Sequence, residues 1–151
     1  MSQHKLKSSK THKRLNIEVQ RKCHIDNGKI ILSFRHLTTN KRYNFEYFKN
    51  TEIRKNLEAR QALDKLFIEI TKIEWVEAIR RGKHRFGGCE TFPKYQLVDI
   101  KIPNMNVTDD TPIYTFRFGN QDEYRVCGIK ENGCHALHII AYDFNYSLYK
   151  H

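Results

Sequence analysis

Two hydrophobic periodicities divide the chain. Between residues 51 and 70, apolar positions recur every three or four residues, which is typical of a helix with one buried side. From residue 113 onward, apolar and polar residues alternate, which is typical of strands with one buried face. These patterns predict helices over about 52–70 and 72–81. We therefore expect an α+β domain in which an antiparallel sheet of about four to six strands packs on two helices.

A β-hairpin is predicted near the end of the chain. Asn132 and Gly133 separate two runs that are rich in β-forming residues, and Asn-Gly is the pair best suited to a two-residue type I′ turn. In that register Cys127 lies directly opposite His138. Alternation along the two strands then predicts a core face that contains Tyr124, Val126, Leu137, Ile139 and Ala141.

The opposite face of these strands is predicted to carry charge. Arg125 and His138 share this face, and Arg117 joins them if the aromatic side of residues 113–118 faces the core. Two guanidinium groups and an imidazole on one surface form the best candidate site. Solvent-facing residues on the sheet of a basic protein are the alternative explanation.

The net charge of +10, from 27 Lys and Arg against 17 Asp and Glu, favours a polyanionic partner such as RNA. Residues 1–14 contain five Lys or Arg and no acidic residue, so we expect a disordered basic arm before a single domain over residues 15–151. Lys13 and Arg14 of this arm are candidates for nucleic-acid binding. A solvated terminus, and a basic protein without such a partner, stay open as alternatives.

A second basic segment follows the predicted helices. Residues 80–88 combine glycine with cations, which allows backbone N–H groups and side chains to lie against phosphates. The segment lacks the Lys-Ser/Thr ending of a nucleotide-binding P-loop, so nucleotide hydrolysis is disfavoured. An ordinary exposed loop explains the composition equally well. The candidate phosphate-binding residues here are Arg80, Arg81, Lys83 and Arg85.

Cysteine and histidine raise the question of a metal ion or a nucleophile. The four cysteines are too scattered for a disulfide framework and are expected to be free thiols. His135 and His138 would point to opposite faces of one strand, which leaves Cys127 and His138 as a two-ligand site. Such a site is weak, so we expect no metal and no cofactor. A catalytic Cys127–His138 pair would need a lowered thiol pKa, for which the sequence shows no signal.

A metal-independent ribonuclease site is the stronger chemical hypothesis. Cleavage of RNA by its own 2′-hydroxyl needs a base, an acid and cations around the phosphate. Arg117 and Arg125 would hold the phosphate in such a site. The candidates for proton transfer are His138, Tyr149 and His151.

The element order and a few short strings resemble the RelE-type messenger-RNA interferase toxins. The similar region, residues 113–149, contains a Tyr-Arg-Val strand, an Asn-Gly hairpin, an apolar strand and a terminal Leu-Tyr. The resemblance implies that Arg125 contacts the scissile phosphate, that Tyr149 stacks on a base or assists proton transfer, and that His151 is comparable to a terminal histidine of some members. It also implies an acidic protein partner. Asp143 stands where the family tends to place an arginine, and its charge would repel phosphate.

The sequence therefore predicts an RNA-binding protein, and a metal-independent endoribonuclease of toxin type if it is an enzyme. The alternative is a non-enzymatic module that binds nucleic acid or protein, such as an antitoxin-like or phage-encoded inhibitor; the tail also resembles uncharacterised small proteins of bacteria and their mobile elements. The orientation of Asp143 distinguishes the enzyme from the non-enzymatic module, because its carboxylate would disfavour catalysis if it pointed into the face of Arg125 and His138. No apolar run approaches the ~18 residues that span a bilayer, so we expect a cytoplasmic protein without a membrane partner.

Overall fold

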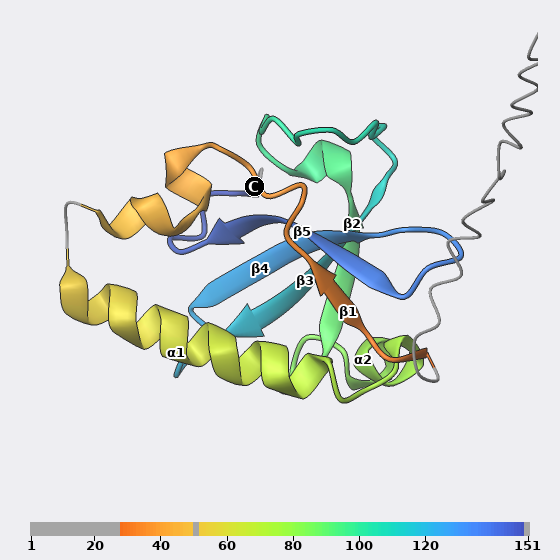
Figure 1. The fold of residues 1–151 in the computed structure, drawn as a ribbon, viewed down its shortest axis with the longest axis horizontal. Helices are drawn as coiled ribbons and strands as arrows, with labels where there is room; N and C mark the ends of the chain where they lie inside the picture. The colour runs from red at the N-terminus through yellow and green to blue at the C-terminus, as the bar shows by residue number, and fades with distance from the viewer. Residues whose placement is uncertain (1–27, 50–51, 150–151) are drawn as a thin grey trace, which may run out of the picture.

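The computed structural model describes residues 28–49 and 52–149 (Figure 1). The predicted basic arm with Lys13 and Arg14, and the candidate His151, lie outside the described residues. The described chain has an α+β architecture, as predicted. Its α-helices are α1 (Ile53–Ile70) and α2 (Trp75–Arg81), and its strands are β1 (Ile31–Ser33), β2 (Cys89–Pro93), β3 (Pro112–Phe118), β4 (Tyr124–Lys130) and β5 (Ala136–Asp143).

The two helices form where the three- and four-residue periodicity predicts them. α1 runs for 18 residues without glycine or proline, and the apolar stripe of its second half is buried, whereas Ile53 and Leu57 near its start are exposed. α2 ends at Arg81 and is capped by Gly82, whose φ of +62° is one that glycine adopts without strain. In the described part of the chain, neither helix is both long and apolar enough to cross a membrane. The buried residues of the pair are Ala59, Leu63, Leu66, Ile70, Trp75 and Ala78.

The sheet has the strand order β1-β5-β4-β3-β2. The strands β2 to β5 pair antiparallel with their neighbours, but β1 is parallel to β5. The prediction of a purely antiparallel sheet is therefore wrong at this edge. Parallel strands need a long crossover connection, and the chain between β1 and β5 supplies one that includes both helices. α1 crosses one face of the sheet (Figure 1).

The β4–β5 hairpin has its turn at the predicted place but a different register. The Cys134 N–H donates to the Glu131 carbonyl at 3.2 Å, which closes a turn around Asn132 and Gly133. Gly133 has a φ of +73°, but Asn132 has no positive φ, so the turn is not type I′. The paired strand begins later, at Ala136.

The shifted register gives His138 a different neighbour. His138 lies opposite Ile129, and Cys127 lies opposite Ala141. The prediction that Cys127 faces His138 is therefore wrong. A hairpin turn fixes the register only when the two strands pair directly on either side of it. Here β5 begins only at Ala136, two residues after Cys134 closes the turn.

A β-bulge on β5 reverses the faces of its last residues. Gly128 pairs with Ile139 and Cys127 pairs with Ala141, so Ile140 is the extra residue. Ile140 and Ala141 consequently both lie in the hydrophobic cluster on the face away from the helices. This corrects the predicted position of Ala141 in the core on the helix side. The same reversal turns Asp143 toward Arg125, its partner on β4.

Hydrophobic clusters lie on both faces of the sheet. On the helix face, α1 and α2 pack against residues that include Val126, Leu137 and Ile139. The second face is covered by the segment between β2 and β3, by Tyr43, and by Leu148 and Tyr149 at the end of the described chain. A hydrogen bond from the Val98 N–H to the Leu148 carbonyl, 2.8 Å long, joins these two covering segments.

The bulge leaves no room for a side chain at position 128. A Cβ on Gly128 would lie 2.5 Å from Leu137 Cδ1 and 2.9 Å from the His138 carbonyl oxygen. We expect Gly128→Ala to lower the free energy of unfolding by about 1 to 3 kcal/mol, the usual cost of overpacking a core. Urea denaturation measures this change. The exposed Lys65→Ala on α1 is the control, with an expected change within about 0.5 kcal/mol, and equal stability of the two variants would contradict the packing argument.

Candidate nucleic-acid interface

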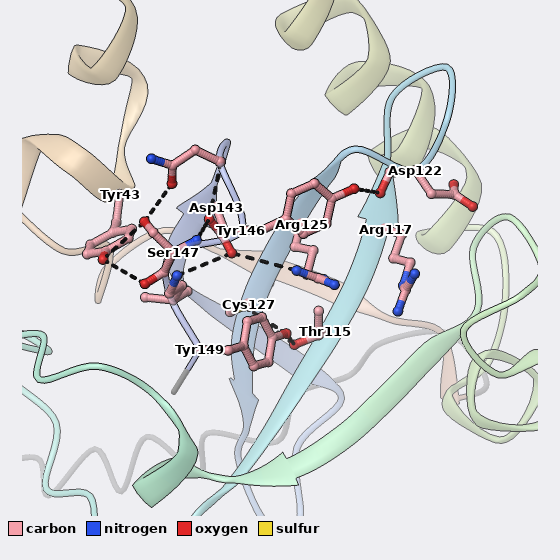
Figure 2. A network of polar contacts seen from close by, with 12 residues as sticks. Tyr43, Thr115, Arg117, Asp122, Arg125, Cys127, Asp143, Tyr146, Ser147 and Tyr149 are labelled. Atoms are coloured by element: carbon pink, nitrogen blue, oxygen red, sulfur yellow. Dashed lines mark hydrogen bonds and ion pairs between the residues drawn. The ribbon is translucent and has the colours of Figure 1, made fainter. Parts of the chain in front are cut away.

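Arg117 on β3 and Arg125 on β4 are direct cross-strand neighbours (Figure 2). Directly paired residues project from the same face, so the predicted placement of these two arginines together is confirmed. Their side chains are 26% and 13% exposed, respectively. The two guanidinium groups therefore lie at the edge of the covered part of the second face, where each keeps a limited contact with solvent.

Arg125 is held by a carboxylate and two aromatic rings. Its Nη1 lies 3.8 Å from Oδ2 of Asp143. Its guanidinium carbon lies 4.4 Å from the ring centre of Tyr146 and 4.8 Å from that of Tyr149. Both distances are typical of cation–π contacts. Nε and Nη1 of Arg125, like Nε of Arg117, are buried and have no hydrogen-bond partner among the described residues.

Asp143 organises the turn that follows β5. Its carboxylate is fully buried and accepts hydrogen bonds from the backbone N–H groups of Asn145, Ser147 and Leu148, at 3.3, 3.1 and 3.4 Å. These contacts direct the C-terminal residues back over the second face. Asp143 also points at Arg125, which is the arrangement expected to disfavour catalysis there, because a fixed anion already occupies the space beside the guanidinium.

Tyr149 is held in the covered part of the second face. Its hydroxyl donates to Oγ1 of Thr115 at 2.9 Å, and its ring centre lies 4.5 Å from that of Phe92. Burial raises the pKa of the Tyr149 phenol, and the nearby Cys127 adds to this increase. Tyr149 therefore keeps its proton at neutral pH and is poorly suited to accept one from a substrate.

Cys127 is a packed thiol. It is fully buried beside Thr115, whose Oγ1 lies 3.4 Å from the sulfur. Burial raises the pKa of the Cys127 thiol to about 12. A nucleophilic cysteine needs a shift in the opposite direction, so the arrangement provides no activated thiol.

His138 lies away from the arginine pair. Its neighbour Ile129 is four residues along β4 from Arg125, which corresponds to roughly 13 Å at about 3.3 Å per residue. Its Nε2 donates to the carboxylate of Glu131 at 3.1 Å. The structure therefore brings Arg117, Arg125 and Tyr149 together but leaves His138 at the other end of the sheet.

The basic loop after α2 meets the arginine pair at Glu90. Oε1 of Glu90 accepts a hydrogen bond from Nη2 of Arg117 at 3.2 Å, and its Oε2 lies 3.8 Å from Nζ of Lys83. Glu90 on β2 thus joins the two groups of candidate phosphate-binding residues. The sequence carried no signal for this role, because it depends on β2 pairing beside β3.

The other candidate cations at the end of α2 and in this loop differ in whether a carboxylate already pairs with them. Arg81 donates to the carboxylate of Glu69 at 2.7 Å and to the Phe86 carbonyl at 3.1 Å, so it serves the packing of the loop. Arg80 pairs with Glu77 on the helix surface. Arg85 is exposed and has no ion-pair partner among the residues that the structure describes.

Tyr146 is a site residue for which the sequence pattern gives no signal. Its side chain is exposed, its φ is +55°, and its hydroxyl donates to the Asp122 carbonyl at 2.9 Å. These contacts place the ring over Arg125 (Figure 2). A tyrosine in the left-handed region is strained, and the hydrogen bonds that Asp143 accepts from the same turn offset this strain.

The ion pair between Arg125 and Asp143 is testable by a double-mutant cycle. Asp143→Asn leaves a buried guanidinium without a counter-ion, and we expect it to lower the free energy of unfolding by about 3 kcal/mol. Arg125→Met should cost a similar amount because it leaves the carboxylate unpaired. The double variant should lose less than the sum by at least about 1 kcal/mol, as measured by urea denaturation. Additive losses would show that the two charges do not stabilise each other.

The raised pKa of Cys127 predicts a loss of stability in alkali. A cysteine of the unfolded chain ionises near pH 8.5, whereas the folded protein keeps the Cys127 proton up to about pH 12. Between these values unfolding releases a proton, so stability falls as pH rises, by about 1.4 kcal/mol per pH unit for this group. Urea denaturation from pH 8 to 11 should show a shallower decline for Cys127→Ala. Val126→Ala, a buried truncation without a titrating group, should keep the wild-type slope, and identical slopes in both variants would contradict the assignment.

Comparisons with known proteins leave the family open. No family model matches this chain, and neither the curated proteins nor the solved structures include a significant match to it. The geometry of Arg117, Arg125 and Glu90 is therefore the basis for a functional proposal.

Proposed function

We propose that this protein binds RNA through its phosphates, on a surface that we call the arginine surface, and does not cleave RNA there. The arginine surface consists of Lys83, Arg85, Arg117, Arg125 and Tyr146. The observation that carries the proposal is the link through Glu90, which holds Lys83 of the loop after α2 beside Arg117, the cross-strand neighbour of Arg125. Such a row of cations suits the regular spacing of phosphates along a strand.

The electrostatics of the arginine surface favour an anion. Its cations outnumber the carboxylates of Glu90 and Asp143 that contact them. The contacts of Glu90 are partly exposed, and exposed ion pairs are each worth about 0 to 1 kcal/mol. A phosphate can therefore replace Glu90 as the partner of Arg117 and Lys83 at small cost. The net charge of +10 adds a long-range attraction.

Tyr146 adds a surface for a base. One side of its ring contacts Arg125, and the side chain is 41% exposed. Stacking of a base on an aromatic ring contributes about 1 to 3 kcal/mol and tolerates any base. This combination of an aromatic ring and phosphate-binding cations favours a single strand over a duplex.

The RelE-type resemblance supports the choice of RNA. The order of a strand, a helix pair and antiparallel strands fits that resemblance. The catalytic activity of that family is not carried over to this chain, because Arg125 is paired with Asp143 and His138 lies far from Arg125 along the sheet. An acidic protein partner would compete with RNA for the same cations.

Two neighbouring charges should change RNA affinity in opposite directions. We expect Arg117→Gln to weaken binding of a labelled single-stranded RNA about 3- to 10-fold, because one phosphate contact is lost. Glu90→Gln should strengthen it, because the internal competitor for Arg117 and Lys83 is removed. Fluorescence anisotropy over a range of salt concentrations measures both, and the slope of log K against log salt should fall by about 0.7 for Arg117→Gln.

The matched control for Arg117→Gln is Lys72→Gln, which removes the same charge from an exposed position after α1. Lys72→Gln should leave affinity near the wild-type value. Equal effects of Arg117→Gln and Lys72→Gln would show that net charge, and not this surface, binds RNA. Labelled RNA should also remain intact in EDTA, and its cleavage by wild type but not by Arg125→Met would overturn the non-catalytic assignment.

A further inference from the structure

A second group of exposed cations lies beside the turn that follows β5. It belongs to the segment between β1 and α1, which forms two short 3-10 helices, η2 (Lys41–Tyr43) and η3 (Phe45–Phe48). Residues of both helices line a hollow of about 550 Å³. We call it the lysine hollow, and its lining residues are Lys41, Arg42, Glu46, Tyr47 and Lys49.

The lysine hollow carries an excess of positive charge. Its three cations are exposed, and Glu46 is the one carboxylate among the described residues that line it. Oε2 of Glu46 lies 3.6 Å from Nζ of Lys41, in an exposed ion pair of the kind that is worth about 0 to 1 kcal/mol. Arg42 and Lys49 have no ion-pair partner in the part of the chain that the structure describes. An anion can therefore replace Glu46 at small cost and pair with the other two cations.

The lysine hollow and the arginine surface flank the same turn, residues 144–147. On one side of the turn, the ring centre of Tyr47 lies 5.7 Å from that of Phe144. On the other side, the ring of Tyr146 contacts Arg125. Consecutive Cα atoms are about 3.8 Å apart, so the Cα atoms of Phe144 and Tyr146 are separated by no more than about 7.6 Å. The two groups of cations are therefore neighbours across this turn.

Hydrogen bonds hold η2 against the turn (Figure 2). The Tyr43 hydroxyl donates to the Ser147 carbonyl at 3.1 Å. The Ser147 N–H donates at 3.1 Å to Asp143, whose carboxylate also pairs with Arg125. Tyr43 is buried, so η2 cannot leave the turn without exposing its ring. The cations of η2 are thus held near Arg125 before any ligand binds, which lowers the ordering cost of binding both groups.

The two groups of cations lie along a line that crosses the strands. Arg117 and Arg125 are on the adjacent strands β3 and β4, and β5 follows β4. The Thr38 N–H donates to the Ile140 carbonyl at 2.8 Å, so the segment that leads into η2 lies on the other side of β5. Three spacings of about 4.8 Å give roughly 14 Å between Arg117 and this segment. About four nucleotides of a stacked strand, at about 3.4 Å each, cover this length.

We propose that the lysine hollow binds phosphates of the same RNA strand that the arginine surface binds, so that the strand crosses the turn at Tyr146. This inference rests on the proposed function. Tyr146 lies between the two groups of cations, where its exposed ring can stack on the base that joins them. The path requires the flexible backbone of a single strand, because it passes over an aromatic ring and two separate groups of cations.

Oligouridines of two lengths test this path with the full chain. One of about 12 nucleotides covers both groups of cations, and one of about 3 nucleotides reaches one of them. Because one strand then links two subsites, the wild type should bind the longer RNA at least about 10-fold more tightly. Lys41→Gln/Arg42→Gln should reduce this preference to about 3-fold or less. It should also lower the slope of log K against log salt for the longer RNA by about 1.4, or about 0.7 for each of two phosphate contacts.

The matched control is Lys65→Gln/Lys72→Gln, which removes the same charge from exposed positions on and just after α1. It should keep the wild-type preference for the longer RNA, as measured by fluorescence anisotropy. Circular dichroism checks the fold of each variant. If Lys41→Gln/Arg42→Gln does not fold, Lys49→Gln decides, and it should weaken binding of the longer RNA about 3- to 10-fold.

The shared path and the proposed function fail in different ways. If Arg117→Gln weakens binding but Lys41→Gln/Arg42→Gln keeps the wild-type preference for length, the shared path is refuted and the arginine surface stands. Two copies of the longer RNA on one chain would also refute the shared path, because the two groups of cations would then be separate sites. If the wild type binds neither oligouridine, the proposed function and the shared path are both refuted.

Discussion

The buried pair of Arg125 and Asp143 depends on one extra residue in β5. Because Ile140 bulges out of the ladder, the strand changes face before Asp143 and delivers its carboxylate beside Arg125. The cost of burying this carboxylate is offset by the guanidinium and by three backbone N–H groups of the following turn. Without the bulge, Asp143 would project toward the apolar helix face, where neither partner is within reach.

The same pair determines how the second face is covered. The turn capped by Asp143 sends the chain back over the second face, where Leu148 joins the second hydrophobic cluster. Tyr146 and Tyr149 then enclose Arg125. The second face consequently has a sealed centre, which contains Cys127, and an accessible margin, which contains Arg117. The proposed arginine surface therefore lies at the margin of this face, where the Arg117 side chain keeps some contact with solvent.

Local pattern was sufficient for some elements and insufficient for others. The helix pair follows from the spacing of apolar residues over residues 52–81, and the cross-strand neighbours Arg117 and Arg125 follow from alternation within two adjacent strands. The parallel pairing of β1 with β5 has no local signature, since it joins segments that are more than a hundred residues apart. The predicted register of β5 was wrong for a similar reason. The late start of β5 after the turn and the bulge at Ile140 both depend on how the two faces of the sheet pack.

The sequence by itself determined the net charge and the positions of the helices and of most strands, because the spacing of apolar residues is a local pattern. It was enough to indicate an α+β domain and a basic protein, and to identify Asp143 as the residue whose orientation separates the catalytic from the non-catalytic hypothesis. Tertiary structure decided which of these groups meet. Lys83 and Arg117 contact the same carboxylate of Glu90, and Arg125 pairs with Asp143. His138 contacts the ring of His36 and not Cys127, its predicted neighbour. Each of these contacts links distant segments whose alignment is set by burial of both faces of the sheet, and a single added residue changes which side chains share a face.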